Sequence, residues 1–197
     1  CSVFVTRAVR MLDEEGLVMT SWAAGNNGHQ AGPYAISGYC MNSSKFSTSC
    51  GALDRNLRPQ YYTSLGGQCY PFQPTVSAPT YGTLPWGAGY MDFGEQGGAT
   101  SACAPQLAGA LAMMMTQHPG RPFRDYRAAL RAGADNAILG LPGVPWHPAT
   151  GAGLLQADRA VAAVPWAKAH PSWLTEARMP TSIPRLGQEA ETDLRKA

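Results

Sequence analysis

The chain has 197 residues, of which 45% are apolar and 14% charged, and its formal net charge is +2. This length fits one domain with a buried core. The small net charge excludes a strongly basic nucleic-acid binder, and no apolar run is long enough to span a membrane. With 22 glycines and 16 prolines, we expect a loop-rich globular protein.

Residues 3–15 are predicted to form an amphipathic helix that ends at Gly16, because apolar residues recur at helical spacing. The stripe that we expect to be buried consists of Phe4, Ala8, Met11 and Leu12. The face that we expect to be solvated consists of Arg7, Arg10, Asp13 and Glu14. An apolar, strand-like run follows at 17–24. This alternation of helix and apolar strand favours a parallel sheet covered by helices.

Further strands are predicted around 48–53 and 75–78, whereas 29–47 and 79–98 are predicted to be mostly loop. The first of these strands is unusually polar for the centre of a sheet. The second loop contains the aromatic residues Trp86, Tyr90 and Phe93. They either pack within the loop or line a cleft.

The segment 97–109 begins with two glycines and leads into an almost entirely apolar stretch. Because Thr100 and Ser101 precede that stretch, we expect a helix over 101–117 that is buried all round. A hydroxyl group is then held at a helix N-terminus, where free N–H groups favour a developing negative charge. This position suits an attacking serine, but a helix-capping hydroxyl explains the same residues.

A second helix is predicted from Pro122 to Gly133. Its buried stripe is expected to consist of Phe123, Tyr126 and Leu130, and its solvated face of Arg124, Arg127 and Arg131. A short helix is expected to open at 151–157 and to run to about 164. Residues 166–197 are rich in proline and polar residues, which is typical of a tail or linker.

Five cysteines leave at least one unpaired. Cys103 is the expected free thiol because its helix is buried, and Cys50 is expected in the core. Cys40 and Cys69 flank a loop-rich stretch and could pair if the protein is secreted. Cys1 could bridge to a segment outside this chain.

Two motifs resemble the subtilisin-like serine proteases, the subtilases. Residues 23–26 read Ala-Ala-Gly-Asn, as in the oxyanion-hole segment of that family. Residues 99–109 resemble the nucleophile segment Gly-Thr-Ser-x-Ala-x-Pro-x-x-Ala-Gly, except that Ala99 replaces the usual glycine and Ala102-Cys103 replace the usual residues. The segments 51–54, 62–66 and 76–80 are similar to further landmarks in the family order. Residues 151–157 also resemble a family segment, with Gln156 in place of Asn.

The resemblance implies an α/β fold, a subtilisin-like parallel sheet flanked by helices, with the N-terminal part of the domain absent from this chain. Residues 1–165 are expected to be the C-terminal half of the catalytic domain and 166–197 a tail or linker. The family order along the chain is Asp, His, Ser. The family Asp and His are therefore expected in the N-terminal half of the domain, and we expect that missing half to be a partner of this chain.

The resemblance assigns Ser101 as the nucleophile and Asn26 as the oxyanion donor of a serine endopeptidase that hydrolyses polypeptide substrates. Ala23, Ala24 and Gly25 match one wall of the primary specificity pocket. No cofactor is required, but Asp54 matches a position that often helps to bind a structural calcium ion. We expect no nucleic-acid or membrane partner, and a secreted or extracellular location.

Four histidines could act as a base within this chain, namely His29, His118, His147 and His170. None matches the family base, and a lone histidine is more often a packing or surface residue. Two other functions stay open. The chain could be a non-catalytic subtilase fragment or pseudoprotease, or a serine esterase on the same scaffold.

Overall fold

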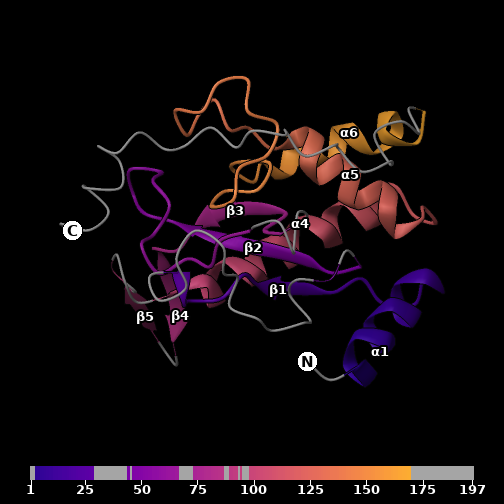
Figure 1. Ribbon diagram of the computed structural model, residues 1–197, viewed down its shortest axis with the longest axis horizontal. Helices are drawn as coiled ribbons and strands as arrows, with labels where there is room; N and C mark the ends of the chain where they lie inside the picture. The colour runs from indigo at the N-terminus through magenta and orange to yellow at the C-terminus, as the bar shows by residue number, and fades with distance from the viewer. Residues whose placement is uncertain are drawn as a thin grey trace.

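The computed structural model describes residues 3–28, 44, 46–66, 73–86, 89–92, 94 and 98–169 (Figure 1). Its helices are α1 Val3–Glu14, the 3-10 helix η2 Thr100–Ala102, α4 Cys103–Gln117, α5 Phe123–Gly133 and α6 Ala157–Ala169. Its strands are β1 Ser21–Ala23, β2 Thr48–Leu53, β3 Val76–Pro79, β4 Thr83–Trp86 and β5 Gly89–Asp92. The predicted strand over 17–24 is therefore limited to three residues.

The central sheet is parallel, as the sequence predicts, with the strand order β1-β2-β3. Ser21 pairs with Thr48 across the first strand pair, and Cys50 pairs with Val76 across the second. The segment after α5 extends this edge, because Ser77 donates its N–H to Gly153 O at 2.9 Å. The predicted α/β class is confirmed.

Helix α4 packs against all three strands, and α6 packs against both α4 and α5 (Figure 1). One face of α4 is buried, and it consists of Cys103, Leu107, Ala110, Leu111 and Met114. The prediction that this helix is buried all round is wrong for the described residues. Met113 and Met115 are 49% and 36% exposed, because no described element covers their face.

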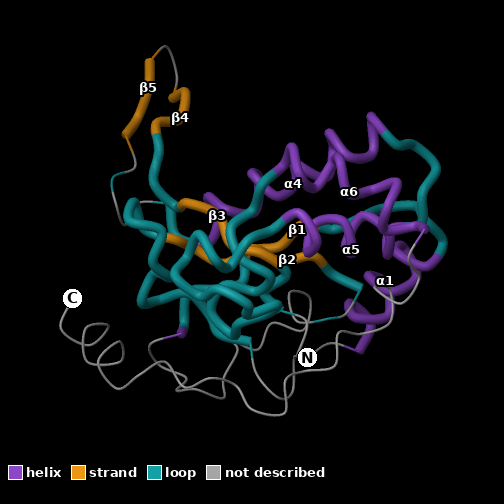
Figure 2. The backbone as a smooth tube through the Cα atoms, turned by 90° about the horizontal axis from the view of Figure 1, so that it is seen from above, coloured by secondary structure: helices purple, strands orange, loops and turns teal. Residues whose placement is uncertain are grey.

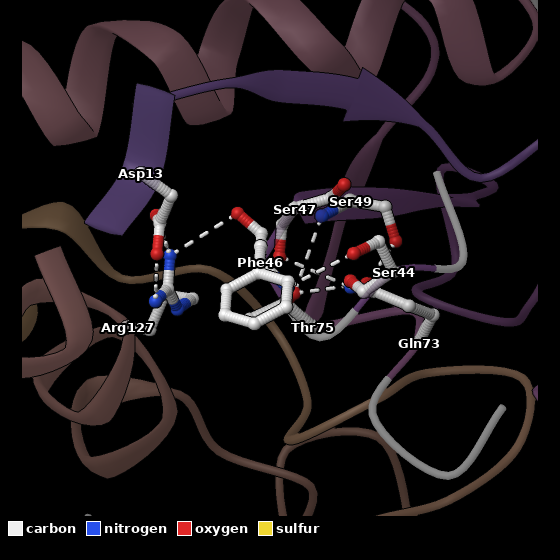
Figure 3. Close-up of polar contacts among 8 residues, drawn as sticks. All are labelled: Asp13, Ser44, Phe46, Ser47, Ser49, Gln73, Thr75 and Arg127. Atoms are coloured by element: carbon white, nitrogen blue, oxygen red, sulfur yellow. Dashed lines mark hydrogen bonds and ion pairs between the residues drawn. The ribbon is translucent and has the colours of Figure 1, made fainter. Parts of the chain in front are cut away.

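Helix α1 has the predicted extent but turns a different face toward the described chain. Phe4 and Met11 of the expected buried stripe are 85% and 56% exposed, whereas Val9 and Asp13 are buried. Asp13, expected on a solvated face, forms a two-point ion pair with the guanidinium of Arg127 (Figure 3). This contact orients α1, because a buried carboxylate needs an opposite charge.

Helix α5 confirms the buried stripe of Phe123, Tyr126 and Leu130. Its two later arginines were wrongly predicted to be solvated. Arg127 is buried beside Asp13 and also donates to Phe46 O at 3.3 Å (Figure 3). Arg131 is partly buried, and desolvation together with the charge of Arg127 lowers its pKa to about 10.

The polar composition of β2 has a structural reason. All six residues of the strand are buried, and the Ser49 hydroxyl meets a polar partner in the segment before β3, whereas Thr48 Oγ1 has no hydrogen-bond partner in the described part of the chain. Ser49 donates its hydroxyl to Gln73 Oε1, and Thr75 Oγ1 donates to the same oxygen at 3.1 Å (Figure 3). Gln73 Nε2 in turn donates to Ser47 O at 3.1 Å. Buried polar groups are stable when they are hydrogen-bonded in this way.

The loop predicted over 79–98 contains an antiparallel hairpin instead, formed by β4 and β5. It projects away from the central sheet (Figure 2). Pro85 and Gly89 lie within its strands, and both residue types weaken strand signals in a sequence. Tyr90 is 81% exposed, whereas the side chains of Trp86 and Phe93 lie outside the described residues.

The C-terminal helix α6 begins later and ends later than predicted. Residues 151–155 contain isolated bridges and a turn in place of helix, and Ala152 donates its N–H to Thr75 O at 3.0 Å. The helix continues to Ala169, with Ala167 buried, so it runs past the expected boundary at 165. Residues 170–197 of the predicted tail, including His170, lie outside the described residues.

Two of the five cysteines can be placed. Cys50 and Cys103 are both free and fully buried, which confirms the predicted free thiol at Cys103 and the predicted core position of Cys50. Burial raises the pKa of the Cys50 thiol, and the neighbouring Cys103 raises it further, so this thiol stays protonated near neutral pH. Cys1, Cys40 and Cys69 lie outside the described residues, and their pairing stays a prediction.

Candidate active site

The segment that follows β1 lies against the N-terminus of the nucleophile helix. Asn26 Oδ1 accepts a hydrogen bond from Thr100 N–H at 3.1 Å and from the Thr100 hydroxyl at 2.8 Å. The Thr100 hydroxyl oxygen accepts the N–H of Gly25 at 3.2 Å. Thr100 is fully buried, so these three bonds form a fixed junction between two segments that are 74 residues apart.

This junction determines what the Asn26 side chain can offer. Both groups of Thr100 donate, so the atom of Asn26 that faces them is the carbonyl oxygen, and the Nδ2 group points elsewhere. Asn26 is exposed, which leaves that N–H₂ group accessible to a molecule bound at the surface. The sequence indicated Thr100 only as a possible helix cap; its contact with Asn26 is long-range and has no local signal.

Ser101 directly follows Thr100 and is exposed within η2. The amide groups in the first turn of a helix point outward along the axis, where they attract negative charge. Asn26, which contacts Thr100, and Ser101, which follows Thr100, therefore lie at the same helix N-terminus. The structure brings together the two residues that the sequence predicted as catalytic.

Ala99, two residues before Ser101, has a backbone conformation that favours glycine. Ala99 has φ 49° and ψ −164°, a region that L side chains rarely adopt. The residue is held there because the Thr80 hydroxyl donates to Ala99 O at 2.6 Å. The chain therefore keeps this turn at the position where the family pattern has glycine.

A further hydrogen bond joins β1 to α4. The Ser21 hydroxyl donates to Ala104 O at 2.8 Å, in the first turn of α4. Ser21 is five residues before Asn26, and Ala104 is three residues after Ser101. The relative position of strand and helix is therefore set on both sides of the candidate catalytic pair.

The three small residues predicted to form a pocket wall lie at the end of β1. Ala23 is the last residue of the strand, Ala24 is buried, and Gly25 is partly exposed. Ala24 donates its N–H to Cys50 O at 2.9 Å, which extends the strand pairing by one residue. The short side chains leave room beside Asn26, but their role in substrate binding stays a prediction.

Neither described histidine is placed as a base for Ser101. His118 lies beyond the C-terminus of α4, about 25 Å along the helix from Ser101. His147 is buried, and its Nδ1 accepts the N–H of Ala149 at 3.2 Å. Burial lowers the pKa of His147, which favours its neutral form. His29 and His170 lie outside the described residues.

Asp54, the predicted calcium ligand, closes a turn. Its Oδ1 accepts the N–H groups of Asn56 and Arg58, both at 2.8 Å. Calcium needs six to eight oxygen ligands, and the described part of the chain contains no cluster of three His, Cys, Asp or Glu residues that could hold a metal ion. Calcium binding through loop carbonyls and the Asp54 carboxylate stays a prediction.

The described residues contain no helix that is both long and apolar enough to cross a membrane. Comparison with solved structures shows likeness to two proteases. A serine-to-alanine mutant of the protease domain of PatA matches with a TM-score of 0.60 and 21% identity, covering 84% of this chain and 55% of that chain. MycP1 with its N-terminal propeptide removed matches with a TM-score of 0.59 and 17% identity, covering 79% of this chain and 54% of that chain. At these identities the likeness shows the fold, and this chain spans about half the length of either structure.

A search of curated protein sequences found no significant match. A family model described as the subtilase family, Peptidase_S8, matches residues 4–154, which include both candidate catalytic residues and all strands of the central sheet. The match covers more than half of the chain, and the parallel sheet agrees with the fold of that family. The chain belongs to the subtilase family of serine proteases.

Proposed function

We propose that this chain supplies the nucleophile and the oxyanion donors of a serine endopeptidase. Ser101 Oγ attacks the carbonyl carbon of a peptide bond, while the side-chain N–H of Asn26 and the backbone N–H of Ser101 stabilise the oxyanion that forms. A general base takes the hydroxyl proton of Ser101 during the attack and returns it to the leaving amine as the C–N bond breaks. Water hydrolyses the resulting acyl-enzyme and regenerates the serine.

One observation carries this proposal: the contact of Asn26 Oδ1 with both donors of Thr100. The contact fixes which way the Asn26 side-chain amide is turned. The contact leaves a hydrogen-bond donor next to an exposed serine at a helix N-terminus. That combination is what acyl transfer requires, because the negative charge develops on the carbonyl oxygen close to the attacking hydroxyl.

The proposal is tested first by mutation of Asn26 in the complete protease. Asn26→Ala is expected to lower kcat with little change in KM, because the side chain meets the oxygen chiefly once it is charged. Loss of one such donor lowers kcat by about 100- to 1000-fold, a magnitude measured on subtilisin. A raised KM at unchanged kcat contradicts the oxyanion role.

The nucleophile is tested by covalent labelling. A fluorophosphonate probe is expected to modify Ser101 and no other residue of the complete protease, because only an activated serine reacts. Peptide mapping by mass spectrometry identifies the labelled residue. Ser101→Ala is the matched control and is expected to abolish both labelling and turnover. Labelling of another serine disproves the assignment.

We further propose that upstream polypeptide supplies the base and its orienting Asp, and that it covers this part of the chain. The support is apolar surface on the N-terminal elements: Phe4, Met11 and Leu17 are 85%, 56% and 70% exposed. In addition, β1 is the first strand in the described order β1-β2-β3, and an edge strand is where further polypeptide can extend a sheet.

Two measurements distinguish a protease from the two alternative functions, a pseudoprotease and a serine esterase. A pseudoprotease keeps the fold but does not react with the fluorophosphonate probe. A serine esterase on the same scaffold prefers short activated esters to peptides, whereas a protease cleaves peptide substrates. The strained Ala99 is the feature that favours the pseudoprotease, and the orientation of Asn26 favours the enzyme.

Substrate class and location follow from the family and stay proposals. The small side chains of Ala23 and Ala24 and the absence of one on Gly25 fit a pocket that accepts an apolar substrate side chain. Secretion is proposed together with a Cys40–Cys69 disulfide. A thiol count of the purified protein under denaturing, non-reducing conditions tests that bond.

A further inference from the structure

We propose that Ser64 is a positioning residue for the oxyanion donor Asn26, an inference that rests on the proposed function. Ser64 hydrogen-bonds to the residues on both sides of Asn26. Its backbone N–H donates to Gly25 O at 2.8 Å, and its hydroxyl oxygen accepts the N–H of Asn27 at 3.3 Å. The peptide groups that flank Asn26 are therefore held by one residue of a separate segment.

The segment that carries Ser64 is itself fixed to the centre of the sheet. Ser64 and Thr63 are each 1% exposed, and the Thr63 hydroxyl accepts the N–H of Ala52 in β2 at 3.0 Å. The contacts of Ser64 therefore fix residues 25–27 relative to β2 in the core of the protein.

The two segments are also in close contact next to Ser64. Gly28 donates its N–H to Tyr62 O at 2.9 Å, and a Cβ atom built on Gly28 would lie 2.0 Å from Thr63 O. No side chain fits between the segments at this point, so glycine is required for the close approach. Residues 25–28 therefore lie directly against residues 62–64 and have little freedom to shift.

These contacts complete the constraints on Asn26. Thr100 holds its side-chain oxygen, and Ser64 holds its backbone on either side. A donor stabilises an oxyanion only when it is already aimed at the place where the charge forms. Displacement of such a group by about 1 Å is enough to lower the rate by about 100-fold. Ser64 thus acts on catalysis through the position of Asn26.

The test is steady-state and single-turnover kinetics of the complete protease with a fluorogenic peptide substrate. Ser64→Ala removes the acceptor for Asn27 and leaves the backbone bond to Gly25 in place. We expect kcat to fall about three- to tenfold, with KM within about twofold of the unmodified protein. A fall in single-turnover acylation of the same size shows that the chemical step is affected.

Two further variants separate positioning from a general loss of stability. Ser44→Ala removes the same kind of bond, because the Ser44 hydroxyl accepts the N–H of Phe46 at 3.2 Å, and it is expected to leave kcat unchanged. Ser64→Cys keeps a side chain of similar shape with a weaker acceptor. The kcat of Ser64→Cys is expected to lie between that of the unmodified protein and that of Ser64→Ala. If Ser64→Ala folds poorly, a kcat of Ser64→Cys below that of the unmodified protein still tests the role of Ser64.

A double-mutant cycle decides the question. If Ser64 acts through Asn26, Ser64→Ala has no further effect on kcat in the Asn26→Ala background. An equal loss in both backgrounds, or a loss in Ser44→Ala as large as that in Ser64→Ala, overturns the Ser64 inference and leaves the role of Asn26 intact. If Asn26→Ala itself leaves kcat unchanged, the proposed oxyanion role fails.

Discussion

The ion pair between Asp13 and Arg127 joins α1 to α5. The two side chains are 7% and 11% exposed, and Arg127 Nη2 donates to Asp13 Oδ2 at 2.9 Å. The perturbation that we consider is Asp13→Asn, which keeps the size of the side chain and removes its charge. Arg127 is then left buried without a carboxylate and beside Arg131, which is also positive.

The magnitude follows from the burial of the pair. Removal of one partner from a buried ion pair destabilises a protein by about 3–5 kcal/mol, because the other charge is stranded away from water. Asparagine retains a carbonyl oxygen that accepts from the guanidinium, so we expect the lower end, about 3 kcal/mol. Solvent screens this pair only weakly, in contrast to an exposed pair.

The chain contains a matched control on the same helix. Arg10 Nε lies 2.9 Å from Glu14 Oε2, and these side chains are 58% and 46% exposed. Glu14→Gln is expected to change the free energy of unfolding by at most about 0.5 kcal/mol, which is typical of exposed pairs at i, i+4. Urea unfolding of the complete protease, followed by circular dichroism at low and moderate salt, measures both variants.

A third variant tests the cause. In Asp13→Asn combined with Arg127→Met no charge is stranded at this position, so the double variant is expected to lose less stability than the sum of the single losses. The reasoning is refuted if Asp13→Asn and Glu14→Gln destabilise equally. It is also refuted if the double variant loses the full sum, because the two charges then act independently.

Three other predictions concern the candidate site and its support. Ala99→Gly is expected to raise the free energy of unfolding by about 1 kcal/mol in urea titrations, because glycine adopts φ 49° without strain; a loss of stability contradicts the strain. Thr100→Val removes the hydroxyl that holds Asn26 Oδ1 and is expected to lower kcat about tenfold at similar KM, with Thr100→Ser retaining most activity; equal activity of the two variants contradicts the role of the hydroxyl. His147 has a lowered pKa in the folded state, so its contribution to stability is fully present above its ordinary value of 6.5 and is lost as pH falls through the lowered value. Thermal unfolding from pH 7.5 to pH 4.5 is therefore expected to show a smaller fall in Tm for His147→Gln than for the unmodified protein, and parallel curves contradict this.

The sequence by itself determined the features that depend on local pattern. Helix α5 at Phe123–Gly133 was predicted almost to the residue, because hydrophobic spacing and its Pro and Gly boundaries mark it. Strand β2 at Thr48–Leu53 was predicted at the same bounds in spite of its polar residues. Asn26 and Ser101 became candidate catalytic residues because each lies in a short motif that resembles a subtilase segment. These signals lie within a few residues of one another and need no tertiary contact.

Only the tertiary structure decided which polar groups are buried and which residues act together. The sequence placed Asp13 and Arg127 on solvated faces, since a charged residue is normally exposed, but they pair across 114 positions. Thr100 reads locally as a helix cap, yet it orients Asn26 across 74 positions, and Ser64 reaches Asn27 across 37 positions. A residue's local sequence does not specify the partner that folding brings to it, because such pairs form only when distant segments pack together.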